Sequence, residues 1–262
     1  MNCSLLTLVV CLGSISLTLS ASAPVVSIPA PDYIAQSVPL SQQAQFITVK
    51  VRSQDFLGSG IILRRNGATY TVLTNAHVLQ AGDPPYRIQT VDGRIYTANL
   101  PQRLNFGKND LAVLQFKSAG SIYAVASFGA SPTPGDEVFA AGYPAVEERG
   151  KKQSFAFTTG KVGLVLAKPL EGGYQLGYTN NIKNGMSGGP LLNRRGQVVG
   201  INGMQAYPLW DQPSVFADGS KAEERLHQMI IRLSWAVPIT KVMQMIPKAE
   251  KTTVTTVFSK AD

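Results

Sequence analysis

The residues best suited to chemistry lie in one glycine-rich stretch, Asn184-Gly185-Met186-Ser187-Gly188-Gly189-Pro190. A serine hydroxyl becomes a good nucleophile only when a neighbouring base takes its proton. The oxyanion that forms on the attacked carbonyl also needs hydrogen-bond donors aimed at it. Glycine adopts backbone angles that other residues avoid, so the N–H groups of Gly185 and Ser187 could converge on one point. The stretch predicts Ser187 as a nucleophile with Gly185 and Ser187 as oxyanion-hole donors, although a glycine-rich turn between strands fits it equally well when taken alone.

Such a serine needs a base and a group that orients the base, and the sequence contains only two histidines. His77 lies in Thr74-Asn75-Ala76-His77-Val78-Leu79, directly after the strand-like run 70–73. Asp110 lies in Asn109-Asp110-Leu111-Ala112-Val113-Leu114, at the head of an apolar run. Taken singly, His77 fits a packed histidine and Asp110 fits a cap at the start of a strand.

Together, the motifs TNAHVL, NDLAVL and GMSGGP resemble the trypsin/chymotrypsin-like serine proteases, and within them the bacterial Deg/HtrA-like branch. This resemblance implies that His77 is the general base, Asp110 its orienter and Ser187 the nucleophile. It also implies that the first-subsite pocket is walled by Asn181, Ile182, Asn202, Gly203 and Gln205. None of these is acidic, and burying an unpaired cation is costly. We therefore expect a neutral, small-to-medium apolar side chain at the cleavage site.

Short strands must position these residues, because β-rich runs alternate with turn signals such as Asn66-Gly67 and Asp92-Gly93. The first set of expected strands is 46–51, 60–63, 70–73, 86–90, 94–100 and 111–116. The second set is 124–128, 137–141, 154–159, 161–166, 174–178, 190–192, 198–201 and 232–237. The pattern predicts an all-β barrel or sandwich. The resemblance implies two six-stranded antiparallel β-barrels, the trypsin-like double barrel, with a short C-terminal helix.

The expected domain order covers the whole chain of 262 residues. It comprises a signal peptide at 1–23, an N-terminal arm at 24–44, a first barrel at 45–122, a second barrel with the C-terminal helix at 123–247 and a flexible tail at 248–262. The tail is too short for a PDZ domain, so the expected relation is to a Deg/HtrA-like branch without one.

The first 23 residues are typical of an export signal, with an apolar core at Leu5–Leu12 and the cleavage pattern Ala21-Ser22-Ala23. The sequence therefore predicts an exported protein, periplasmic or secreted, with no stable membrane span after processing. Cys3 and Cys11 both lie in this segment, so the mature chain would contain no disulfide. Few soft ligands then remain, and we expect no metal and no cofactor.

The formal charge of +8 raises the question of a nucleic-acid partner. Lysine and arginine are scattered in small groups without interleaved aromatic residues, which favours a solvated surface. The expected partner is instead a protein or peptide substrate, and the sequence leaves the oligomeric state open.

Near the C-terminus, Ser220-Lys221-Ala222-Glu223 predicts a capping box that starts a helix. One helical face would then carry Ala222, Leu226, Met229 and Ile230, and His227 would lie on another, exposed to solvent.

These features predict an exported serine endopeptidase that acts through an acyl-enzyme intermediate. The alternative is a catalytically silent binding module with a protease fold. Esterase chemistry on an α/β-hydrolase fold is disfavoured, because that fold places its histidine last. Met186 cannot form the ion pair that activates trypsin zymogens, so the site is either constitutive or set by ordering of the loop 178–186.

Overall fold

The computed structural model describes residues 38–101, 104, 106–145, 154–207 and 214–245. The expected signal peptide, both cysteines and the tail after residue 247 lie outside these residues, as do residues 24–37 of the expected arm. None of the helices in the described part is long and apolar enough to cross a membrane.

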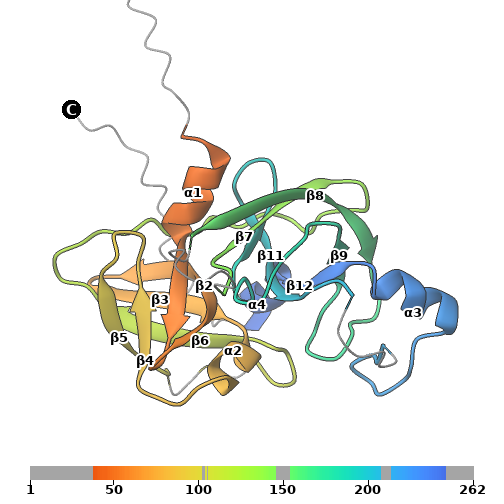
Figure 1. The fold of residues 1–262 in the computed structure, drawn as a ribbon, viewed down its shortest axis with the longest axis horizontal. Coiled ribbons are helices and arrows are strands. Elements are labelled where there is room, and N and C mark those ends of the chain that lie inside the picture. Colours follow the sequence, from red (N-terminus) through yellow and green to blue (C-terminus); the bar gives the residue numbers. More distant parts are fainter. Residues whose placement is uncertain (1–37, 102–103, 105, 146–153, 208–213, 246–262) are drawn as a thin grey trace, which may run out of the picture. The chain divides into compact units, whose positions relative to one another are not determined.

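The first half of the described chain forms a closed antiparallel barrel (Figure 1). Its strands are β1 (Thr48–Arg52), β2 (Phe56–Asn66), β3 (Thr69–Thr74), β4 (Tyr86–Gln89), β5 (Ile95–Asn99) and β6 (Ala112–Lys117). They follow the order β1-β2-β3-β6-β5-β4. Apolar side chains fill the interior of this barrel, where Tyr70 stacks on Phe116 with ring centroids 5.1 Å apart.

The second half forms another closed antiparallel barrel of six strands, with the order β10-β11-β12-β9-β8-β7. Its strands are β7 (Glu137–Gly142), β8 (Ala156–Val165), β9 (Leu176–Tyr178), β10 (Pro190–Leu192), β11 (Val198–Met204) and β12 (Ser234–Pro238). The all-β double barrel expected from the sequence is therefore confirmed. Within the described ranges, four short helices accompany the barrels: α1 (Leu40–Ile47), α2 (Ala76–Gln80), α3 (Glu224–Ile230) and α4 (Ile239–Met245).

A shared apolar cluster joins the two barrels. Ile61, Leu73 and Val113 come from the first barrel, whereas Ala141 and Ile201 come from the second. Each of these side chains is almost fully buried. Because close-packed apolar side chains resist displacement, this cluster fixes loops of one barrel against loops of the other.

Two expected strand boundaries were wrong. The expected strands 154–159 and 161–166 are replaced by one strand, β8 (Ala156–Val165), which continues through Gly160. A Cβ at Gly160 would lie 2.3 Å from Asn180 Oδ1, so this glycine permits a close approach rather than a turn. The expected strand at 124–128 forms only an isolated bridge, between Phe128 and Val198.

Two expectations about helices were also wrong. Phe46 and Ile47 end helix α1 instead of starting a strand. Only Ala44 and Ile47 of this helix are buried, which is too few for the sequence to show a helical period of apolar residues. The Ser220 segment is a turn, in which the Ser220 carbonyl accepts from Phe216 N–H, so α3 begins only at Glu224.

The sequence pattern predicted an exposed His227, and this was wrong: the residue is buried, with only 6% of its surface accessible. Its Nδ1 accepts a hydrogen bond from the Ser214 N–H at 3.2 Å. The segment that begins at Ser214 therefore covers the helical face that the sequence pattern assigned to solvent.

Candidate active site

His77 lies in the first turn of α2, immediately after β3. Two hydrogen bonds fix the chain that leads to it: Thr74 Oγ1 donates to the Ser59 carbonyl at 2.7 Å, and Asn75 Nδ2 donates to the Asp110 carbonyl at 2.7 Å. The imidazole itself is 45% exposed. A rigid backbone thus presents a side chain that solvent and a ligand can reach.

Asp110 holds His77 through both of its carboxylate oxygens. Oδ2 lies 2.6 Å from His77 Nδ1, and Oδ1 accepts the His77 backbone N–H at 2.9 Å. Because a carboxylate only accepts hydrogen bonds, Nδ1 carries the proton, and the lone pair of Nε2 is free to take another. The contacts therefore select the tautomer that a general base requires.

The charge state of Asp110 follows from opposing effects. Burial raises the pKa of this carboxyl, whereas hydrogen bonds from His77 and Tyr174 and the charge of His77 lower it, and the pKa ends below its usual value. Asp110 is therefore ionised at neutral pH. The Tyr174 hydroxyl, from the second barrel, donates directly to Oδ2.

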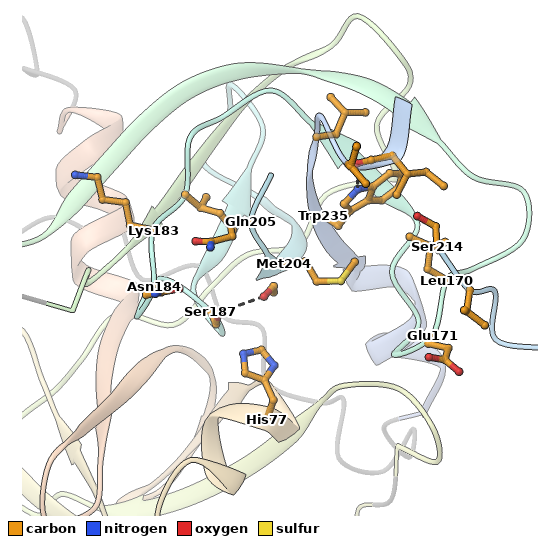
Figure 2. A pocket seen from close by; sticks show the side chains of 16 residues that line it. His77, Leu170, Glu171, Lys183, Asn184, Ser187, Met204, Gln205, Ser214 and Trp235 are labelled. Carbon is orange, nitrogen blue, oxygen red and sulfur yellow. Dashed lines mark hydrogen bonds between the residues drawn. The ribbon is translucent and has the colours of Figure 1, made fainter. Parts of the chain in front are cut away.

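Ser187 lies in the loop before β10, between two glycines with positive φ, Gly185 at +89° and Gly188 at +82°. The Ser187 carbonyl accepts the Ser59 N–H of the first barrel at 2.9 Å. Its hydroxyl donates to the Gly203 carbonyl at 3.2 Å. Figure 2 shows His77 pointing from its helix toward Ser187, and both residues line the same cavity.

The segment 183–186 forms a β-turn, closed by the Met186 N–H on the Lys183 carbonyl at 3.0 Å. The positive φ of Gly185 at its third position makes this a type II turn. The Asn184 carbonyl accepts the Ala145 N–H at 2.7 Å. In a trans peptide the carbonyl and the N–H point in opposite directions, so this bond turns the Gly185 N–H away from Ala145.

The Gly185 carbonyl is fixed as well, because it accepts the Ser59 hydroxyl at 2.8 Å. The peptide groups on both sides of Gly185 are therefore held by hydrogen bonds. A Cβ on Gly185 would lie 2.5 Å from the Ala145 nitrogen. Only glycine fits this position.

A cavity of about 440 Å³ opens beside His77 and Ser187. Its apolar lining is formed by Leu170, Ile182, Met204, Val215, Ile230, Ile231, Leu233 and Trp235. Its polar lining is formed by Glu171, Lys183, Asn184, Gln205 and Ser214. Figure 2 shows that Glu171 and Lys183 lie at opposite ends, with the apolar side chains between them. The cavity therefore offers an apolar surface next to the serine.

Of the five residues expected to wall a substrate pocket, Ile182, Gly203 and Gln205 line this cavity. Asn181 is exposed and is not among the lining residues. Asn202 is fully buried, and its amide donates to the Ala141 and Pro190 carbonyls at 3.1 Å each. Asn202 thus ties β11 to β7 and β10.

Sequence reasoning missed Leu170, Glu171 and Tyr174, which come from a segment before β9. The pair Gly172-Gly173 was the available signal, but a glycine pair indicates only a turn. Among the described residues, no group of three or more His, Cys, Asp or Glu side chains is arranged to hold a metal ion.

Comparisons with known proteins agree with this geometry. Residues 58–201, more than half of the chain, match the family model of the trypsin-like peptidase domain. The serine protease Do-like HtrA of Bacillus subtilis is 32% identical over 153 residues, which cover 56% of this chain and 33% of that protein. The serine endoprotease DegS of Salmonella typhimurium is 32% identical over 147 residues, covering 56% and 39%.

The serine protease HTRA1 of Xenopus laevis is 32% identical over 157 residues, covering 55% of this chain and 30% of that protein. The matches thus span about a third of the length of these relatives. The family match contains His77, Asp110 and Ser187. The resemblance to the Deg/HtrA proteases is confirmed, and the chain belongs to the trypsin-like peptidase family.

Proposed function

We propose that this protein is an exported serine endopeptidase that cleaves peptide bonds through Ser187, His77 and Asp110. The observation that carries the proposal is the hydrogen-bonded pair of His77 and Asp110, whose imidazole lines the same cavity as Ser187. Names of relatives support the reaction class, because all three are called serine proteases or endoproteases.

The reaction begins when the Ser187 hydroxyl gives up its hydrogen bond to the Gly203 carbonyl and turns toward His77. As Oγ attacks the scissile carbonyl carbon, its proton passes to His77 Nε2. Asp110 stabilises the resulting imidazolium. The N–H groups of Gly185 and Ser187 bind the oxyanion.

Collapse of this tetrahedral intermediate breaks the C–N bond, and His77 returns its proton to the leaving amine. The product is an ester between Ser187 and the acyl half of the substrate. Water then attacks this ester with His77 as base, which releases the carboxylate product and regenerates the serine.

The turn at 183–186 supports a constitutive site. Its type II geometry, the Ala145 contact and the buried Met186 hold this turn through contacts within the chain itself. No ion pair from a newly cut N-terminus is needed to hold the Gly185 N–H in place. The protein is therefore active as soon as it has folded.

The substrate side chain that enters the cavity is apolar and uncharged, because most of the lining next to Ser187 is apolar. The strand β11 ends at Met204, beyond Ile201, the last of its residues paired with β10, and this end accepts the substrate backbone as an added strand. Export to the periplasm or the medium rests on the apolar run Leu5–Leu12 and the pattern Ala21-Ser22-Ala23.

Incubation of the purified protein with an unfolded protein substrate tests the proposal. Wild type should produce fragments whose new carboxyl ends are apolar residues, as read by mass spectrometry, and Ser187→Ala should produce none. If both proteins bind the substrate but neither cleaves it, the alternative of a catalytically silent binding module is correct.

A further inference from the structure

Asp110 has a hydrogen-bond donor that the sequence motifs do not include. The Tyr174 hydroxyl donates to Asp110 Oδ2, the same oxygen that lies 2.6 Å from His77 Nδ1. The tyrosine belongs to the second barrel and the aspartate to the first. Tyr174 is only 4% exposed, so water does not compete for this contact.

The backbone around Tyr174 is built to hold this contact. The Gly172 carbonyl accepts the Asp110 N–H at 2.8 Å, which ties the segment to the acid itself. The Leu170 N–H donates to the Tyr174 carbonyl at 2.9 Å, and the Gly173 N–H donates to the Leu170 carbonyl at 3.0 Å. These bonds close a compact turn. The hydroxyl therefore reaches Asp110 from a fixed backbone.

Space for the ring depends on Gly203. A Cβ at this position would lie 2.3 Å from both Cε1 and the hydroxyl oxygen of Tyr174. A larger residue would push the ring away from Asp110, so the lack of a side chain at Gly203 and the contact of Tyr174 are linked.

The Tyr174 hydroxyl remains a donor at every working pH. Burial raises the pKa of this phenol, and the neighbouring Asp110 charge raises it further. A protonated phenol beside an ionised carboxylate can only donate. Unlike water, it cannot leave when substrate arrives.

We propose that Tyr174 is a positioning residue for catalysis, whose hydroxyl fixes the Asp110 carboxylate in the orientation that holds His77. The inference rests on the proposed function of the His77–Asp110 pair. A carboxylate with a single side-chain donor can turn about its last bond. With two donors on Oδ2 and the His77 N–H on Oδ1, it cannot turn without breaking one of them.

Tyr174→Phe removes the hydroxyl and keeps the ring beside Gly203. A hydrogen bond to a charged group typically contributes enough to change a rate about tenfold, so kcat should fall by about that factor. KM should stay close to wild type, because Tyr174 does not line the cavity. The matched control is Tyr70→Phe, which removes another buried hydroxyl, from the core of the first barrel.

A second measurement does not depend on proteolysis. In the Ser187→Ala background, the titration of His77 is followed by NMR, with His227→Gln used to assign the two histidine signals. Loss of the Tyr174 donor leaves more negative charge on Asp110, so the His77 pKa should rise in Tyr174→Phe and not in Tyr70→Phe. This readout distinguishes failure of the inference from failure of the proposed function.

Site-specific 3-fluorotyrosine at position 174 covers the case in which Tyr174→Phe does not fold. Fluorine makes the phenol a stronger donor, so the His77 pKa should fall, opposite to the effect of removing the hydroxyl. The proposal is overturned if kcat and the His77 pKa are unchanged in Tyr174→Phe, or if the fluorinated protein titrates like wild type.

Discussion

Gly185→Ala is the substitution that most sharply distinguishes the effect of the proposed oxyanion-hole backbone from the effects of the rest of the fold. Gly185 has φ +89°, where any residue with a Cβ is strained by about 1–2 kcal/mol. The new methyl would also lie 2.5 Å from the Ala145 nitrogen and 2.7 Å from the Tyr143 carbonyl oxygen. Both neighbours are backbone atoms of the segment that follows β7, so neither can move aside without a shift of the main chain.

A flip of the peptide group between Asn184 and Gly185 would relieve this clash and strain most easily. That motion breaks the hydrogen bond from Ala145 to the Asn184 carbonyl and points the N–H of residue 185 away from the substrate. Loss of one oxyanion donor typically costs about 10²–10³ in kcat, or about 2.7–4 kcal/mol. KM should change much less, because the donor acts mainly on the transition state.

Gly135→Ala is the matched control. Gly135 has φ +94°, and a Cβ there would meet nothing within 4 Å. It should therefore cost about the same backbone strain in thermal stability while leaving kcat unchanged. Steady-state cleavage of a chromogenic peptide and thermal unfolding of both variants give the comparison.

A wild-type kcat in folded Gly185→Ala would refute the reasoning about the turn. An equal loss of activity in Gly135→Ala would also refute it, since strain alone would then explain the effect.

Three further predictions concern the acid and the cavity. Asp110→Asn should lower kcat by about 10⁴ in the same peptide assay, because an amide no longer fixes the tautomer of His77. The depressed pKa of Asp110 stabilises the fold above about pH 4, the unfolded value, and this contribution is lost as pH falls through the lower folded pKa. Thermal unfolding of wild type and Asp110→Asn should therefore differ at pH 6 and converge toward pH 2. Ile182→Ala should lower kcat/KM about tenfold for peptides with an apolar residue at the cleavage site. Its labelling by a small fluorophosphonate should stay close to wild type.

Local patterns in the sequence predicted an all-β barrel or sandwich, and the resemblance to the trypsin/chymotrypsin-like serine proteases implied the double barrel. Alternating runs between turn signals indicated strands, and the motifs around His77, Asp110 and Ser187 identified side chains that the structure brings to one cavity or into direct contact. These features are readable because each depends on neighbours within a few residues of the chain.

Features that depend on distant contacts were not predictable in the same way. Gly160 resembled a break between two strands, but it lies within one strand, where its missing side chain leaves space for Asn180. His227 resembled an exposed helical residue until the segment at Ser214 was seen to cover it. Tyr174 meets Asp110 across 64 positions of the chain. No period or turn signal encodes such a contact, because the tertiary fold alone creates it.

The proposed function requires that His77 and Asp110 make Ser187 nucleophilic. Intact-mass analysis after treatment with a fluorophosphonate measures this most directly, because the reagent forms a stable bond only with an activated hydroxyl. We expect one adduct per chain, located at Ser187 by peptide mapping, and almost none in His77→Ala. An unmodified wild-type protein, or an adduct that forms equally fast in Ser187→Ala, would contradict the claim.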